Sequence, residues 1–144
     1  MDLSNFGKFP SLRGKTVFVT GGGSGIGAAI VEGFVDQGAR VAFVDIDEAA
    51  SEVLCDQLRA RYGAAPHFTR CDISDIPALQ AVIEKAGRDL GDIGVLVNNA
   101  ANDQRHQWQD VTPDYWDERM AINLRPMFFA IQTVAPQMLS LIHI

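Results

Sequence analysis

The chain has 144 residues, a formal net charge of −6 and 47% hydrophobic residues, which is enough apolar material for one folded domain. The acidic balance argues against nucleic acid or an anionic membrane surface as a partner, and no apolar run reaches the length of a membrane span. Two cysteines without a secretory signal, and histidines too scattered for a metal motif, indicate a reduced cytoplasmic protein that binds no metal.

Short β-branched runs alternate along the chain with longer stretches of helical spacing. The short runs predict strands at 16–19, 41–44, 67–69 and 95–97, the last of them buried on both faces. The longer stretches predict helices at 25–37, 47–62, 75–90 and 112–139, with a break or bend at 123–126. In the first two helices we expect Ile26 and Val53 to face inward.

The turn after the first strand is rich in glycine and leads into a helix. It reads Thr20-Gly21-Gly22-Gly23-Ser24-Gly25-Ile26-Gly27. Such a turn presents free N–H groups at the positive end of a helix dipole, which favours a phosphate, and a Cβ would block a pyrophosphate. The next strand ends in Asp45, about 20 residues later, where an acid that binds ribose hydroxyls is expected. Packing alone could produce a glycine turn, but the combination predicts a dinucleotide site.

Right-handed crossovers between parallel strands predict an α/β protein with a Rossmann-type doubly wound sheet in the order 3-2-1-4. The switch point then lies between the first and fourth strands. The glycine turn and the segment Asn98-Asn99-Ala100 should therefore meet at one crevice. We expect residues 1–144 to form a single incomplete dinucleotide-binding domain, truncated after the fourth strand, with an atypical tail at 140–144.

The glycine spacing has the form T-G-x-x-x-G-x-G, and three further motifs follow it in order. The motif residues are Thr20, Gly21, Gly25 and Gly27 in the turn, Asp72 after the third strand, Asn98-Asn99-Ala100 after the fourth, and Asn123 in the last helix. From about residue 12 to residue 138 the chain resembles the short-chain dehydrogenase/reductase family. The resemblance implies an oxidoreductase in which a bound nicotinamide carries the hydride.

Asp45 favours NAD over NADP, because a 2′-phosphate would meet a like charge. Family members that use NADP often carry a basic residue where Ser24 or Ile46 stands here. The resemblance implies that Asp72 binds the adenine amine and Ile73 lines its ring, with helix capping by Asp72 as the alternative. The cofactor-binding set is thus predicted to be Thr20, Gly21, Gly23, Ser24, Gly25, Ile26, Gly27, Asp45, Ile46, Asp72, Ile73, Asn98, Asn99 and Ala100.

Catalysis in the family uses a Tyr as acid/base, a Lys four residues later, a Ser and an Asn. Asn123 matches the Asn, but no residue matches the other three. Tyr62 is followed by Pro66 at that spacing, and Tyr115 by Arg119. The end of the chain also lacks the polar, glycine-rich turn expected there. We therefore expect an incomplete gene, a truncation or a foreign junction after residue 139, and a chain that is inactive alone.

Residues 102–106 and 111–120 resemble the family branch that oxidises aldoses at carbon 1, such as NAD-dependent D-xylose dehydrogenases. Asn102, Asp103 and His106 are the predicted substrate residues, although an exposed polar loop would look the same. A 3-oxoacyl or other ketone reductase of the family and a non-catalytic NAD-binding module remain alternatives. The resemblance also implies a small-molecule substrate and a homo-oligomeric parent protein.

Overall fold

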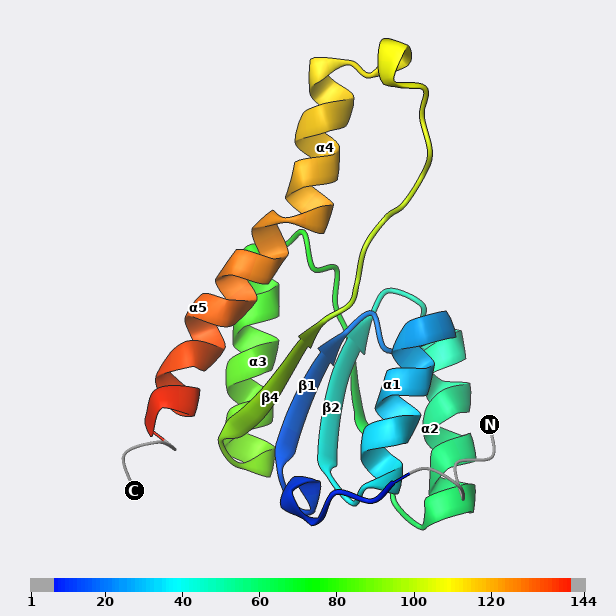
Figure 1. The fold of residues 1–144 in the computed structure, drawn as a ribbon, viewed down its shortest axis with the longest axis vertical. Helices are drawn as coiled ribbons and strands as arrows, with labels where there is room; N and C mark the ends of the chain where they lie inside the picture. Colours follow the sequence, from blue (N-terminus) through cyan, green and yellow to red (C-terminus); the bar gives the residue numbers. More distant parts are fainter. Residues whose placement is uncertain (1–6, 141–144) are drawn as a thin grey trace.

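The computed structural model describes residues 7–140 and contains one parallel sheet (Figure 1). Its strands in the described residues are β1 (Thr16–Thr20), β2 (Arg40–Asp45), β3 (His67–Arg70) and β4 (Ile93–Asn98). The sheet order is β3-β2-β1-β4, as the sequence predicted. In register, Thr20 lies opposite both Val44 and Asn98, so the carboxyl ends of three strands meet at one edge.

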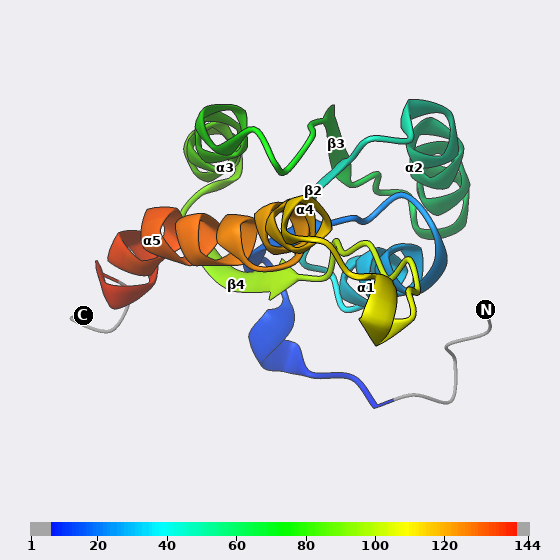
Figure 2. The ribbon, with the colours of Figure 1, turned by 90° about the horizontal axis from the view of Figure 1, so that it is seen from above.

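Helices cover both faces of the sheet. They are α1 (Gly25–Asp36), α2 (Glu48–Tyr62), α3 (Ile76–Leu90), α4 (Pro113–Asn123) and α5 (Arg125–Ser140), with 3₁₀ turns at Pro10–Leu12 and Trp108–Asp110. Seen from above, α1 and α2 lie on one side of the sheet, and α3 and α5 on the other (Figure 2). Successive side chains of β1 point to opposite faces of the sheet and so pack in both layers. Phe18 packs in the α3–α5 core, and Val17 and Val19 pack in the α1–α2 core.

Three expectations about burial were wrong. Val53 is 56% exposed because α2 packs through Leu54 and Leu58, which are spaced four residues apart on the inward face. Ile26 is 76% exposed because it sits in the first turn of α1, at the edge of the sheet. Only the first residue of β4 is fully buried, since β4 is the last strand of the described sheet and has a neighbour on one side only.

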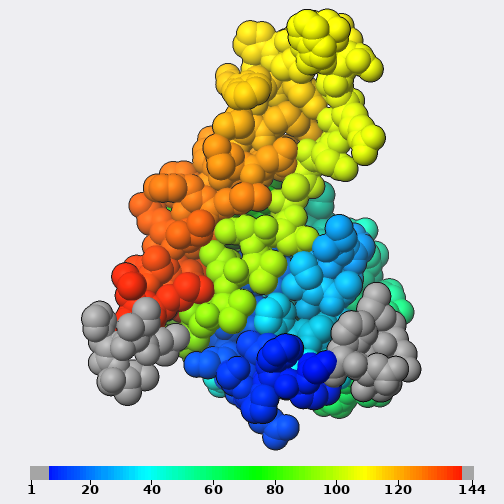
Figure 3. Space-filling view, viewed as in Figure 1, coloured from blue at the N-terminus to red at the C-terminus, as the bar shows by residue number. Residues whose placement is uncertain are grey.

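The last helical region is interrupted where the sequence predicted a bend. α4 ends at Asn123, and Leu124 leaves helical geometry with φ −124° and ψ −51°. α5 then begins at Arg125, and Pro126 fits its first turn because the N–H that proline lacks would be unpaired there anyway. α4 and the segment before it project beyond the carboxyl edge of the sheet (Figures 1 and 3).

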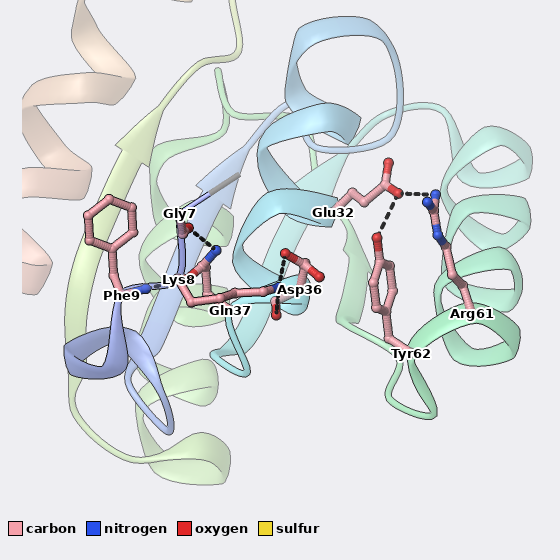
Figure 4. A network of polar contacts seen from close by, with 8 residues as sticks. All are labelled: Gly7, Lys8, Phe9, Glu32, Asp36, Gln37, Arg61 and Tyr62. Atoms are coloured by element: carbon pink, nitrogen blue, oxygen red, sulfur yellow. Dashed lines mark hydrogen bonds and ion pairs between the residues drawn. The ribbon is translucent and has the colours of Figure 1, made fainter. Parts of the chain in front are cut away.

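The amino-terminal segment is tied to the far end of α1, away from that edge (Figure 4). The Gln37 amide accepts the N–H of Phe9 at 2.8 Å and donates to the carbonyl of Gly7 at 3.2 Å, and Lys8 pairs with Asp36. Residues 1–6, and the tail prediction beyond Ser140, lie outside the described residues. No helix in the described part is long and apolar enough to cross a membrane.

Candidate functional site: the crevice at the carboxyl edge of the sheet

A cleft of about 550 Å³ opens at the carboxyl ends of the strands. The predicted residues that line it are Gly21, Ser24, Ile26, Gly27, Asp45, Ile46, Asp72, Ile73, Asn99, Ala100, Asn102 and Asp103. The lining does not include Thr20, Gly23, Gly25, Asn98, His106 or Asn123. Five residues line it without having been predicted, each next to a residue that was: Val44, Cys71, Ser74, Ala101 and Ile122. The structure thus gathers most of the predicted set around one cavity.

The glycine turn is fixed by close backbone packing. Gly21 and Gly25 have φ angles of 68° and 53°, which L side chains rarely adopt. A Cβ on Gly27 would collide with the carbonyl oxygen of Gly21 and come within 2.8 Å of Asn99 Nδ2. A Cβ on Gly23 would reach Ser51 Oγ and lie 3.0 Å from the Asp45 carboxylate. Side chains at these two positions would therefore collide with neighbouring atoms, and glycine leaves the main chain open to the close approach of a pyrophosphate.

Asp45 ends β2 beside this turn, and backbone donors orient its carboxylate. Oδ2 accepts the N–H of Gly23 at 2.8 Å, and Oδ1 accepts the N–H of Asp47 at 3.0 Å. A carboxylate oxygen has two acceptor sites, so each oxygen can take a further hydrogen bond from a ligand. Arg40 lies at the opposite end of β2, where its guanidinium donates to the carbonyl of Gly14.

Thr20 and Asn99 join β1 to β4 directly behind the glycine turn. Thr20 Oγ1 accepts the backbone N–H groups of Asn99 and Ala100, each at 3.1 Å. Asn99 Nδ2 donates to the carbonyls of Thr20 and Gly21, at 3.2 and 2.9 Å. The Asn99 amide thus donates to two carbonyls at the switch point, while Thr20 Oγ1 accepts two backbone N–H groups that follow β4. Asn99 therefore braces the start of the glycine turn against the end of β4.

Asp72 forms a local turn after β3. Its Oδ1 accepts the backbone N–H of Ser74 at 2.9 Å and the Ser74 hydroxyl at 2.7 Å. These two hydrogen bonds lower the pKa of the Asp72 carboxyl below its usual range. The cap of α3 is Asp75, which accepts the N–H of Ala78. Asp72 is therefore not the helix cap, and it is one of the residues that line the cleft.

Asn123 binds the backbone of the segment that follows β4. Its Oδ1 accepts the N–H of Asn102 at 2.8 Å, and its Nδ2 donates to the Asn102 carbonyl at 3.0 Å. The three predicted substrate residues are not brought together, since only Asn102 and Asp103 line the cleft. His106 lies against the Tyr115 ring instead, with a centroid distance of 4.0 Å. In the described residues no group of His, Cys, Asp and Glu is arranged to hold a metal.

Fold and cleft together define a Rossmann-type α/β domain, and comparison with known proteins gives its family. Residues 15–142 match the family described as short chain dehydrogenase. The chain belongs to this family of oxidoreductases.

Two relatives in the family are about half identical to the chain over the residues that match. It is 52% identical over 131 residues to the probable galactose dehydrogenase GalD of Rhizobium meliloti, covering 91% of the chain and 51% of that protein. It is 50% identical over 130 residues to D-xylose 1-dehydrogenase of Caulobacter vibrioides, covering 90% of the chain and 50% of the relative. The chain therefore spans about half the length of these curated relatives.

A solved structure of the family has a fold similar to that of this chain. The NADPH-bound short-chain oxidoreductase of Pseudomonas aeruginosa superimposes with a TM-score of 0.82 at 32% identity. The match covers 88% of this chain and 49% of that one. Because that relative binds NADPH, family membership alone does not select between NAD and NADP.

Proposed function

We propose that this chain is the cofactor-binding part of an NAD-dependent dehydrogenase that oxidises an aldose, such as D-xylose, at carbon 1. The observation that carries the proposal is the Asp45 carboxylate, held at the cleft by the N–H groups of Gly23 and Asp47. The cleft residues fit a dinucleotide, because a Cβ on Gly21, Gly23 or Gly27 would collide with neighbouring atoms, so the main chain at these positions stays free of side chains. When bound, the nicotinamide supplies the hydride chemistry.

The preference for NAD follows from charge. Asp45 accepts hydrogen bonds from both ribose hydroxyls, whereas a 2′-phosphate is repelled. Neither Ser24 nor Ile46, which both line the cleft, offers a positive charge to offset that repulsion. Hydrogen bonds to a charged group contribute about 1.5–3 kcal/mol, so NADH should bind roughly ten- to a hundredfold more tightly than NADPH.

The choice of a sugar rests on two kinds of support. The relatives described above are named as galactose and D-xylose dehydrogenases. In addition, Asn102 and Asp103 line the cleft and offer amide and carboxylate groups to a polyhydroxylated molecule. An acyl chain or a steroid would instead need an apolar lining at this end.

We expect the 144-residue chain to bind the cofactor but not to catalyse the oxidation of substrate. Neither of its two tyrosines has a lysine four residues later. Without that acid/base pair, proton transfer loses roughly 10²–10⁴-fold. A non-catalytic NAD-binding module would behave in the same way toward cofactor but would not bind sugar.

Isothermal titration of the chain tests the proposal. NADH and NADPH are titrated first, into the unsubstituted chain and into Asp45→Ala, which should lose most of the preference for NADH. D-xylose and D-galactose are then titrated into the NAD⁺ complex, and an acetoacetyl thioester into the NADH complex. Binding of the thioester but not the sugars would favour a ketone reductase, and binding of neither would favour the module. Equal affinities for NADH and NADPH in the unsubstituted chain would contradict the proposed preference for NAD.

We further propose that α4 and α5 carry a subunit contact, as the family resemblance implies. Their exposed side chains include large apolar groups spaced three, four or eight residues apart, namely Trp116, Leu124, Phe128, Ile131 and Leu139. Large apolar side chains exposed on two consecutive helices favour self-association. Light scattering of the chain should therefore show oligomers, and Phe128→Glu should reduce them. A monodisperse monomer would contradict this contact.

A further inference from the structure

The segment at the mouth of the cleft has almost no apolar anchoring. Residues 101–112 are all exposed, so no buried side chain fixes their path. Asn123 holds the backbone of Asn102 from one end of α4. Further along the segment, the hydroxyl of Tyr115 donates to the carbonyl of Gln104 at 2.8 Å. The path of this segment past the cleft therefore depends on a few side chains of α4.

Arg119 lies between these two attachment points on α4. Residues four apart share a helix face, so Tyr115, Arg119 and Asn123 follow one another toward the sheet. The Arg119 guanidinium lies 5.2 Å from the centre of the Tyr115 ring, a cation–π distance, and its Nη2 pairs with Glu118. The His106 ring packs on the same Tyr115 ring. Tyr115 thus has a cation and an imidazole against its ring and a backbone carbonyl at its hydroxyl.

Arg119 is poorly explained as a residue that stabilises the fold. Its side chain is only 13% exposed, and its Nε and Nη1 are buried without an acceptor in the described residues. Buried donors without partners destabilise a folded protein. Arg119 instead supplies a cation to the Tyr115 ring. Tyr115 in turn contacts the segment that includes Asn102 and Asp103, two residues of the cleft lining.

We propose that Tyr115 and Arg119 are positioning residues for the substrate: they hold residues 102–106 against α4 and so fix Asn102 and Asp103 at the mouth of the cleft. The proposal rests on the proposed function, in which this segment faces the sugar. Neither residue lines the cavity, so the pair acts through the segment. The cofactor turn is braced separately by Thr20 and Asn99 and should be unaffected.

Three variants of the chain test this role. Tyr115→Phe removes the hydroxyl that reaches Gln104 and keeps the ring. Arg119→Met removes the charge and the two unpaired donors and keeps an unbranched, flexible stem. Tyr62→Phe is the matched control, because it removes a tyrosine hydroxyl that donates to Glu32 at 3.0 Å (Figure 4), and neither residue lines the cleft. Each is compared with the unsubstituted chain by amide hydrogen exchange, by thermal unfolding, and by titration with NADH and, in the presence of NAD⁺, with D-xylose.

Tyr115→Phe and Arg119→Met should speed exchange at 102–106 and weaken D-xylose binding about three- to tenfold, the range expected for one hydrogen bond. NADH affinity should stay the same, and Arg119→Met should not lower the Tm. Tyr62→Phe should lower the Tm and leave exchange at 102–106 and sugar affinity unchanged. Unchanged exchange in both α4 variants would overturn the proposal, as would a lower Tm for Arg119→Met without any change at 102–106. If the unsubstituted chain binds no aldose, the proposed function fails, and exchange alone then decides the positioning role.

Discussion

The two sides of the cleft are built on different principles. On the cofactor side, β1 is buried along its whole length, and the glycine turn is held by backbone contacts and the Thr20–Asn99 bonds. On the other side, residues 101–112 are exposed and are attached through side chains of α4. A site that offers backbone N–H groups to a phosphate needs a fixed main chain, whereas a loop that selects a substrate can change its side chains on a constant scaffold.

The largest effect should come from Gly27→Ala, which tests the rigidity of the cofactor side. The new Cβ would collide with the carbonyl of Gly21, and a backbone atom in a braced turn cannot move aside. We expect a loss of stability of about 3 kcal/mol or more and no measurable NADH binding. Urea unfolding and titration with NADH measure both.

Gly33→Ala is the matched control for that substitution. Gly33 lies in the same helix, and a Cβ there would meet nothing within 4 Å. Alanine should stabilise the helix by about 0.5–1 kcal/mol and leave NADH binding unchanged. If Gly27→Ala and Gly33→Ala changed stability and NADH binding in the same way, a steric clash in the turn would not be the reason for glycine at position 27.

Asn99→Ala should have the next largest effect. It removes two donors and leaves the carbonyls of Thr20 and Gly21 without these partners. A partly buried group left unpaired costs about 1–3 kcal/mol, so the free energy of unfolding should fall by roughly 2 kcal/mol. NADH affinity should fall as well, because the turn loses its brace. Unchanged NADH affinity would show that β1 and α1 hold the turn without help from β4.

Asn123→Ala applies the same change to the other side of the cleft. Its two hydrogen bonds to Asn102 are exposed, so water can replace them, and the expected loss of stability is below about 1 kcal/mol. Faster amide exchange should be confined to the segment that follows Asn102, with NADH affinity intact. A loss as large as that of Asn99→Ala would remove the distinction between the two sides.

The sequence was sufficient for the architecture because local signals and topology rules agree. The order β3-β2-β1-β4 follows from strand spacing and crossover handedness, and the break between α4 and α5 falls within the predicted 123–126. The placement of Val53 and Ile26 failed, because helical spacing alone does not say which neighbouring residue faces the sheet. The bond from Asn123 to Asn102 joins residues 21 positions apart and has no local signal. The packing of His106 on Tyr115 likewise depends on the path of an exposed segment.

The smallest expected effect concerns Asp72, on the cofactor side. Hydrogen bonds from Ser74 lower the pKa of this carboxyl, so the folded chain favours its ionised form. That contribution is present above the ordinary carboxyl pKa and is lost as the pH falls through the lower pKa of the folded state. Ser74→Ala removes the hydroxyl bond and keeps the backbone bond. Because Asp72 is exposed, the loss of stability at neutral pH should stay below about 1 kcal/mol.

Urea unfolding of the unsubstituted chain and of Ser74→Ala should show this difference at neutral pH and none in acid, where Asp72 is protonated in both. A difference that persisted in acid would mean that Ser74 stabilises the turn without the Asp72 charge.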